Sequence, residues 1–284
     1  MSDVRLIASD AYSLELRYAI ADSVRAAAEA ARAWHGRGDK VAADAAAVAA
    51  MREVLADAPF DGVVVIGEGE KDEAPMLANG ERLGRAPAPS CDVAVDPLDG
   101  TRLTAEGLPG SVCVIALAPR GTLFDPRDVF YMDKLVCSAA GAGVVSLDRS
   151  PGDNARALAE ALGKPVEELV VAVLDKPRHV ALIAELRGVG VALSLRGEGD
   201  VSVAIEAADP DGAVDLVLGI GGTPEGVVAA CAVRALGGVM EGRLAPQTDL
   251  ERANALAAGH DLERLLRLED LVASDDVLFA GCAV

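Results

Sequence analysis

The segment Cys91-Asp-Val-Ala-Val-Asp-Pro-Leu-Asp-Gly-Thr101 constrains the fold of this chain more than any other stretch. Its first five residues predict a short buried strand, which Pro97 and Gly100 then end. Asp96 and Asp99 lie three residues apart across the turn that follows, so both carboxylates can face one point. Because Asp, Pro and Gly are also ordinary turn formers, this stretch taken alone fits a structural turn equally well.

A second strand end of the same kind lies upstream, in Val63-Val-Val-Ile-Gly-Glu68-Gly-Glu70. Two such strands can lie side by side in one sheet, which would gather four carboxylates at one edge. Carboxylates without an equal number of nearby bases repel one another, and a divalent cation is their natural neutraliser. Hard oxygen ligands select Mg²⁺ or Mn²⁺, so the pattern predicts a metal site.

The composition restricts the possible partners. The 284 residues, 51% of them hydrophobic, are enough for a sizeable core. With 26 Lys and Arg against 45 Asp and Glu, the net charge of −19 argues against nucleic acid as a partner. The same charge would repel a small anion at long range, so a bound phosphate must be met by metal ions and a few placed cations.

Two further features bear on location. No uncharged apolar stretch approaches the roughly 18 residues that span a bilayer, and the N-terminus has no basic segment followed by an apolar one. The five cysteines have no Cys-x-x-Cys spacing and are expected to be buried, reduced thiols; they are Cys91, Cys113, Cys137, Cys231 and Cys282. We therefore expect a cytoplasmic protein with no membrane partner.

Apolar periodicity predicts the order of the elements. In the first half we expect helices at Tyr12 to Trp34 and Val41 to Leu55, and strands at Val63 to Ile66, Cys91 to Val95, Ser111 to Ala118, Tyr131 to Leu135 and Gly143 to Leu147. In the second half we expect helices at Asn154 to Leu162, Arg178 to Leu186, Asp200 to Ala207 and Pro224 to Leu236, alternating with strands at Leu169 to Leu174, Val191 to Leu195 and Val214 to Ile220. This alternation indicates βαβ units, and the turn-forming residues 148–153 place a boundary between domains 1–150 and 151–284.

Two acidic residues keep two interpretations each. Asp44 interrupts a small, apolar surface near the start of its helix, where it is either an N-terminal cap or a functional group. Glu225 follows the glycines of Gly219-Ile-Gly-Gly222 in the first turn of a helix, where backbone amides can approach an anion. It is either a cap stabilised by the helix dipole or a further metal ligand. The loop lacks the Lys-Ser/Thr ending of a P-loop, so it does not indicate nucleotide binding.

Six motifs, taken in order, resemble those of the class II fructose-1,6-bisphosphatases, which belong to the lithium-sensitive, metal-dependent superfamily of sugar and inositol phosphatases. The motifs are Gly36-Arg-Gly-Asp-Lys-x-Ala-Ala-Asp44, Ile66-Gly-Glu-Gly-Glu-x-Asp-Glu-Ala-Pro-Met-Leu77, Val95-Asp-Pro-x-x-Gly-Thr-Arg102, Tyr131-Met-x-Lys-Leu135, Lys176-Pro-Arg-His179 and Gly219-Ile-Gly-Gly-x-Pro-Glu-Gly226. They span almost the whole chain. Asp-Pro-x-Asp-Gly-Thr alone would indicate only the superfamily.

The resemblance implies an α/β fold, an α-β-α-β-α sandwich with the active site between two halves. It implies that the protein hydrolyses the 1-phosphate of fructose 1,6-bisphosphate in gluconeogenesis. It also implies a cytoplasmic homo-oligomer. It implies that Mg²⁺ or Mn²⁺ is held by Asp44, Glu68, Asp96, Asp99 and Glu225. It assigns catalysis to Thr101, which orients or deprotonates the attacking water with Asp44 as its partner. It implies that the sugar phosphate is bound by Asp99, Gly100, Thr101, Tyr131, Lys176, Arg178, Glu198, Asp200 and Gly222. The first domain then carries most metal ligands, and the second carries substrate-binding residues and Glu225.

The chain departs from the family pattern at three points. Asp99 stands where the family usually has Glu, Glu198-Gly-Asp200 stands where it commonly has Asp-Gly-Asp, and the sequence ends at Val284 where family members continue. These departures keep open a phosphatase for another sugar phosphate, such as sedoheptulose 1,7-bisphosphate or a monophosphate. A silent sugar-phosphate-binding regulator is the alternative from another class. Lys176 and Arg178 also fit an exposed helix start, and Tyr131 an ordinary strand residue.

Overall fold

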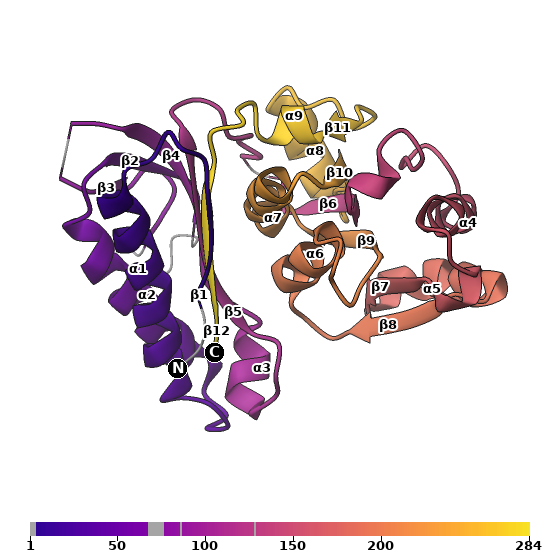
Figure 1. Cartoon of the computed structure of the whole chain (residues 1–284), viewed down its shortest axis with the longest axis horizontal. Helices are drawn as coiled ribbons and strands as arrows, with labels where there is room; N and C mark the ends of the chain where they lie inside the picture. The colour runs from indigo at the N-terminus through magenta and orange to yellow at the C-terminus, as the bar shows by residue number, and fades with distance from the viewer. Residues whose placement is uncertain (1–3, 68–76, 86, 128) are drawn as a thin grey trace. The chain divides into compact units, whose positions relative to one another are not determined.

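The computed structural model describes residues 4–67, 77–85, 87–127 and 129–284 (Figure 1). The chain forms two compact units. Unit 1 comprises Met1–Asp125 and Val272–Val284, and unit 2 comprises Pro126–Leu271. The boundary expected at residue 150 therefore lies inside unit 2.

Unit 1 is a six-stranded mixed sheet with two long helices on one face (Figure 1). The strand order is β1-β12-β5-β4-β2-β3. The strands are β1 (Val4–Ala8), β2 (Asp61–Ile66), β3 (Arg82–Leu83), β4 (Ser90–Asp99), β5 (Val112–Pro119) and β12 (Leu278–Ala283), and the helices are α1 (Leu14–Arg32), α2 (Lys40–Ala56) and the short α3 (Thr101–Glu106). The parallel pairing of β2 with β4 confirms that the two acidic strands are neighbours in one sheet.

The two predicted helices of unit 1 are confirmed, and their sequences explain why they form. Ser13 caps α1, because its side chain accepts a hydrogen bond from the amide of Leu16. Leu16, Ile20 and Val24 recur every fourth residue on one face and are fully buried against the sheet. At about 25 cal/mol per Å² of apolar surface, this shared core is the main stabilising contribution to the unit.

The central strand of unit 1 corrects one prediction. β4 does not end at Val95 but continues through Pro97 to Asp99. Its pairing with β5 shifts register between Asp96 and Asp99, which marks a bulge. Proline is tolerated at such irregularities because they leave a residue out of the hydrogen-bonded ladder. The bulge changes the spacing of the two carboxylates along the edge of the sheet.

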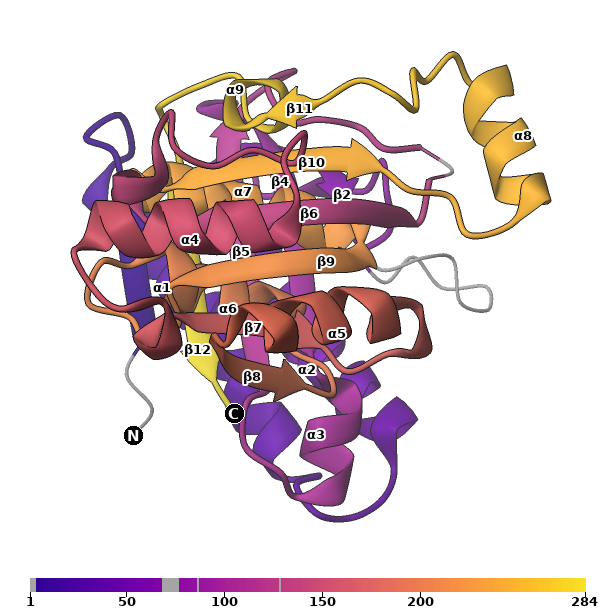
Figure 2. The same cartoon turned by 90° about the vertical axis from the view of Figure 1, so that its right-hand side faces the viewer.

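Unit 2 is a second six-stranded mixed sheet, ordered β11-β10-β6-β9-β7-β8, with helices on both faces. Figure 2 shows α4 and α5 in front of its strands and α6 and α7 behind them. The strands are β6 (Tyr131–Cys137), β7 (Val170–Leu174), β8 (Ala192–Arg196), β9 (Leu216–Gly222), β10 (Val239–Leu244) and β11 (Leu266–Arg267). The helices are α4 (Pro151–Leu162), α5 (Val180–Val189), α6 (Asp200–Ala208), α7 (Thr223–Leu236), α8 (Asp249–Ala257) and α9 (Leu268–Leu271).

The expected βαβ units are present where β7 pairs in parallel with β8 and β9. The strand expected at Gly143 to Leu147 is wrong, because this segment forms turns after a short 3₁₀ helix at Ala139–Gly141. The helix expected from Arg178 begins at Val180, after a 3₁₀ turn at Pro177–His179. The sequence analysis did not identify β1, β3, β10, β11, β12, α3, α8 or α9.

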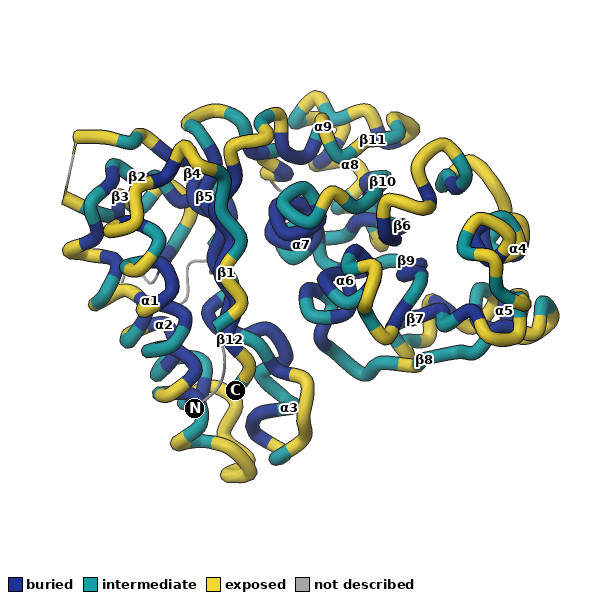
Figure 3. The backbone as a smooth tube through the Cα atoms, in the orientation of Figure 1, coloured by how far each residue is buried: buried dark blue, intermediate teal, exposed yellow. Residues whose placement is uncertain are grey.

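Together the units contain the layers of the expected α/β class: a helical layer and a sheet in unit 1, and a sheet with helices on both faces in unit 2. Burial follows these layers (Figure 3), and residues 226–233 of α7 are all buried. All five cysteines are buried, free thiols, as predicted. In the described parts of the chain, no helix is long and apolar enough to cross a membrane.

Candidate active site

The turn that precedes α2 is anchored to α3. The amides of Gly36 and Gly38 donate to the carbonyls of Thr104 and Ala105 at 2.9 and 2.8 Å. A Cβ added to Gly107 would lie 3.3 Å from the Cα of Gly36, so both backbones approach closely because neither residue has a side chain. This motif therefore fixes the start of α2, and with it Asp44, relative to the end of β4.

Asp44 is the fifth residue of α2 and is half-buried. The N-terminal cap of this helix is Asp39, whose side chain accepts a hydrogen bond from the amide of Ala42 at 3.0 Å. The capping interpretation of Asp44 is therefore wrong. Because α2 packs against both β4 and α3, Asp44 lies on an element that contacts the acidic strand end.

Asp96, Asp99 and Thr101 are brought together by the bulge and the turn that ends β4. Oδ1 of Asp96 accepts a hydrogen bond from the amide of Leu98 at 3.1 Å, which stabilises the bulge. Asp99 is 93% buried at the last position of the strand. Gly100, with a φ of +79°, reverses the chain so that Thr101 begins α3. The hydrogen bond from Thr104 Oγ1 to Ser111 Oγ, 2.8 Å long, holds α3 against the start of β5.

A further carboxylate of β4 has a structural role. Asp92 is buried, and its Oδ2 accepts hydrogen bonds from the amides of Gly121, Thr122 and Leu123 at 2.7, 3.0 and 3.2 Å. These bonds fix the turn after β5. Among the carboxylates of β4, Asp96 and Asp99 therefore remain the candidates for chemistry.

In unit 2 the structure brings together Tyr131, Arg178 and Gly222. Tyr131 begins β6 and pairs with Gly222 at the end of β9. The guanidinium of Arg178 lies over the Tyr131 ring, and its Nε donates to the carbonyl of Ile220 at 2.9 Å. Arg178 is exposed, whereas Tyr131 and Gly222 are half-buried. Two contacts thus hold the guanidinium at the edge of the sheet. Arg178 is nevertheless exposed just before α5, so the structure is compatible with the exposed helix start as well as with a binding role.

A buried charge cluster lies beside them. Lys134, only 3% exposed on β6, forms an ion pair with Asp200 and donates to the carbonyl of Gly222 at 2.9 Å. Burial raises the pKa of Glu225, and the Lys134 ammonium nearby counters that rise. Oε2 of Glu225 is buried and has no hydrogen-bond partner. Sequence reasoning missed Lys134, although a lysine inside an apolar strand is a signal for a paired, buried charge.

The glycines at the end of β9 make room for this cluster. A Cβ on Gly221 would come within 2.1 Å of Oδ2 of Asp200, and one on Gly222 within 1.7 Å of Oε2 of Glu225. These distances are far below van der Waals contact, so no other residue fits there without displacing a carboxylate. The glycine-rich loop therefore admits acidic side chains close to the backbone.

The remaining predicted site residues are located by their position in the fold rather than by side-chain contacts. Glu68 lies outside the described residues. Lys176 and Glu198 are half-buried, on the turn after β7 and just before α6. The described site residues Asp44, Asp96, Asp99, Gly100 and Thr101 belong to unit 1, and the others to unit 2. Over residues 4–67, 77–85, 87–127 and 129–284, no three His, Cys, Asp or Glu side chains are grouped so as to hold a metal ion.

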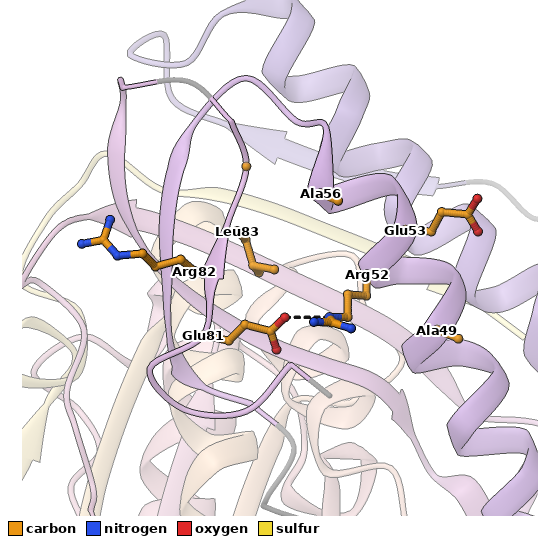
Figure 4. Close-up of a pocket in the computed structure, with 8 residues that line it drawn as sticks. Ala49, Arg52, Glu53, Ala56, Glu81, Arg82 and Leu83 are labelled. Atoms are coloured by element: carbon orange, nitrogen blue, oxygen red, sulfur yellow. Dashed lines mark hydrogen bonds and ion pairs between the residues drawn. The ribbon is translucent and has the colours of Figure 1, made fainter. Parts of the chain in front are cut away.

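Two surface pockets help to delimit the site. One of about 550 Å³ lies in unit 1, and Figure 4 shows Arg52 and Glu81 meeting in it while Glu53 points away. It contains none of the predicted site residues. Another, of about 220 Å³ in unit 2, is lined by Asp133, Arg178 and His179 among others. The second pocket therefore adjoins the Arg178 contacts.

Acidic strand ends and a hydroxyl at a helix start in unit 1, and a placed guanidinium in unit 2, are the kinds of group that a metal-dependent phosphatase uses. The sequence model of the family described as "Bacterial fructose-1,6-bisphosphatase, glpX-encoded" matches residues 14–284. The chain is 42% identical over 283 residues to fructose-1,6-bisphosphatase 1 class 2 of Escherichia coli K12, which covers 95% of this chain and 84% of that protein. The class 2 fructose-1,6-bisphosphatases of Escherichia coli O6:H1 and Shigella flexneri match to the same extent. The chain belongs to the family of class II fructose-1,6-bisphosphatases, which are metal-dependent phosphoric monoester hydrolases.

Proposed function

We propose that this protein removes the 1-phosphate of fructose 1,6-bisphosphate, releasing fructose 6-phosphate and phosphate in gluconeogenesis. Membership of the family, which extends over residues 14–284, is the observation that carries this proposal. The guanidinium of Arg178, held by Tyr131 and by the Ile220 carbonyl, supports it because a bisphosphate needs a cation for its second phosphate.

The donor set fits a divalent metal. Asp44, Asp96, Asp99 and Glu225 offer carboxylate oxygens, the ligands that Mg²⁺ and Mn²⁺ prefer, and Glu68 would add another. The buried, unpartnered Oε2 of Glu225 is the most specific sign, because a buried carboxylate oxygen normally has a hydrogen-bond donor. We infer that these five residues hold Mg²⁺ or Mn²⁺. Such an ion, when bound, activates water and stabilises charge on the phosphoryl group.

We assign the positioning of the attacking water to Thr101, with Asp44 as its partner. Thr101 is the first residue of α3, and the turn that anchors α2 to α3 also fixes the helix that carries Asp44. A threonine hydroxyl both donates and accepts hydrogen bonds, so it can pass a proton from water to a carboxylate. The nearby Asp99 and Gly100 would contact the same phosphate.

In unit 2, Lys176 and Arg178 would bind the phosphate that is not cleaved, and Tyr131, Glu198, Asp200 and Gly222 would contact the sugar. The ion pair with Lys134 fixes the direction of the Asp200 carboxylate, which would accept hydrogen bonds from sugar hydroxyls. Glu198 stands where the family commonly has Asp, and its longer side chain would alter which sugar is bound. This residue is the reason to test a second bisphosphate.

The experiment is a phosphate-release assay with Mg²⁺ or Mn²⁺ on fructose 1,6-bisphosphate, sedoheptulose 1,7-bisphosphate, fructose 1-phosphate and fructose 6-phosphate. We expect the highest kcat/KM for fructose 1,6-bisphosphate, no release from fructose 6-phosphate, and loss of activity with a chelator. A higher kcat/KM for the seven-carbon bisphosphate would reassign the substrate. Absence of release from every compound, with metal present, would indicate a sugar-phosphate-binding regulator.

We further propose that the protein acts in the cytoplasm as a homo-oligomer. Five buried, free thiols support a reducing compartment. Light scattering of the purified protein would measure the number of copies.

A further inference from the structure

The strands β7 and β9 separate at the end of the sheet where Arg178 lies. They pair in parallel at Val171 with Leu216 and at Ala172 with Val217, and the described register ends there. β7 stops at Leu174, and the chain turns through Lys176 into the 3₁₀ turn Pro177–His179. Ile220 lies farther along β9, opposite Asp133 of β6, and its amide and carbonyl therefore have partners other than β7 on the side where β7 has ended.

Two consecutive side chains replace that missing strand. His179 Nε2 accepts from the amide of Ile220 at 2.8 Å, and Arg178 Nε donates to the carbonyl of the same residue at 2.9 Å. The other ring nitrogen of His179 lies 2.7 Å from the carbonyl of Leu174. One imidazole thus joins the last residue of β7 to the end of β9.

The partners determine the protonation state of the ring. The Ile220 amide can only donate, so Nε2 must be unprotonated, and the Leu174 carbonyl can only accept, so Nδ1 must carry the hydrogen. The geometry therefore requires the neutral Nδ1–H form. His179 is 2% exposed, and a Cβ on Gly219, where φ is +122°, would lie 2.9 Å from Nε2. The ring therefore packs directly against the β9 backbone at Gly219, where a side chain would collide with it.

We propose that His179 is a positioning residue for the bound sugar phosphate: its neutral imidazole holds the 176–178 turn against the end of β9, and protonation releases that turn. This inference deepens the proposed function and rests on it. An imidazolium would place an N–H against the Ile220 amide, so one of the two links would be lost. The turn that carries Lys176 and Arg178 would then be held less firmly against β9, although neither side chain touches the ring nitrogens.

The charges around His179 are mixed. Arg178 precedes it, Asp133 faces it from β6 and Asp200 from α6, and Arg149 lines the same 220 Å³ pocket. Burial is the largest influence and lowers the pKa of His179, and Arg178 lowers it further, while the Leu174 carbonyl and the two aspartates act in the opposite direction. Because the ring lines a pocket, solvent can deliver the proton.

The test compares His179→Gln with His179→Leu in the full chain. Gln can place an acceptor near the position of Nε2, whereas Leu fills the space without a polar atom. Hydrogen exchange of the Ile220 amide, measured by NMR, reports the link directly. We expect exchange on the order of tenfold faster in the Leu variant than in the unaltered protein, and closer to normal in the Gln variant.

The second readout is binding of fructose 6-phosphate by calorimetry, in the presence of Mg²⁺, at pH 7.5 and 5.5. We expect the Leu variant to bind about tenfold more weakly at pH 7.5, with a raised KM and little change in kcat for the bisphosphate. Lowering the pH should weaken binding more in the unaltered protein than in the Gln variant. The phosphate group of fructose 6-phosphate titrates in the same way with both proteins. The difference between their changes in affinity therefore reports the titration of His179.

The outcomes separate the two proposals. Equal Ile220 exchange in all three proteins, or faster exchange with unchanged binding of fructose 6-phosphate, would overturn the role of His179 and leave the phosphatase assignment standing. If the unaltered protein bound no fructose 6-phosphate and released no phosphate from the bisphosphate, the proposed function would fail first. A fall in kcat with unchanged KM and unchanged binding would also overturn the positioning role, because it would place the effect in the chemical step.

Discussion

The guanidinium carbon of Arg178 lies 5.1 Å from the centroid of the Tyr131 ring. Neither this stacking nor the Nε bond to Ile220 uses the two terminal nitrogens of Arg178, so both could donate to a bound anion. The pair therefore acts as a fixed cationic arm at the end of the sheet.

Arg178→Ala should raise KM for fructose 1,6-bisphosphate by about 10- to 100-fold, the scale of a lost charge-assisted hydrogen bond. Fructose 1-phosphate, which lacks the second phosphate, should be hydrolysed with nearly unchanged kcat/KM. Arg178→Lys is the matched control, because it keeps the charge but loses the stacking and the Nε bond. Its KM for fructose 1,6-bisphosphate should lie between those of the unaltered protein and of Arg178→Ala. Equal losses on both substrates would rule out a role in binding the distal phosphate.

Asp96→Asn should abolish nearly all activity while the protein stays folded. The amide retains an oxygen for the Leu98 amide, so the bulge is preserved, but the charge that a cation requires is lost. Metal affinity by calorimetry and the thermal unfolding midpoint are the two measurements. Asp92→Asn serves as a control, because this carboxylate stabilises a turn with three amides and should lower the midpoint instead. A variant at Asp96 that fails to fold would mark this residue as structural.

Thr101→Val should lower kcat by about 10²- to 10⁴-fold with little change in KM, the scale of lost proton-transfer assistance. Valine keeps the branched shape and removes only the hydroxyl. Thr104→Val, in the same helix, breaks the hydrogen bond with Ser111 and should reduce stability without a specific loss of kcat. If Thr101→Val changed KM alone, the hydroxyl would bind substrate and take no part in the chemistry.

The sequence predicted the long, periodic elements well and the irregular ones poorly. α1 was found because its apolar residues repeat at the helical period along its length, and α2 because its sequence is rich in alanine, a strong helix former. The strand β12 was missed, although it pairs between β1 and β5, because Leu278–Ala283 gives six residues with no alternation of apolar and polar side chains. Pro97 was taken as a strand end because the pairing shift between Asp96 and Asp99 depends on β5, a partner distant in sequence.

For the candidate site, the strand ends were predictable and the supporting contacts were not. Acidic residues after apolar runs pointed to Asp96 and Asp99, since parallel and neighbouring strands gather such groups at one edge. The link between Lys134 and Asp200 joins residues 66 positions apart, so no local pattern contains it. His179 was noted only within a motif, because its role depends on where β7 and β9 separate.

Lys134→Met should destabilise the protein by about 3–5 kcal/mol, because removing one member of a buried ion pair leaves Asp200 without its counter-charge. The free energy of unfolding from urea titration would measure the loss. Asp200→Asn in the Lys134→Met background should recover part of it, since the second substitution removes the uncompensated charge. Additive losses in this double-mutant cycle would show that the two side chains are not coupled.

The last prediction concerns stability against pH. The pKa of His179 is lowered in the folded protein from its ordinary value of 6.5, mainly by burial. The unfolded chain therefore binds more protons than the folded one once the pH falls through 6.5, and stability declines until the pH passes below the folded pKa. The decline contributed by this group is at most about 1.4 kcal/mol per pH unit.

Gln at position 179 does not titrate, so the free energy of unfolding of the His179→Gln variant should fall less between pH 7.5 and 5.5 than that of the unaltered protein. Carboxylates such as Asp133 titrate in both proteins and largely cancel in the difference. Parallel stability curves for the two proteins would show that His179 carries no proton-linked stability, and a steeper curve for the Gln variant would mean that the imidazole is stabilised in its charged form.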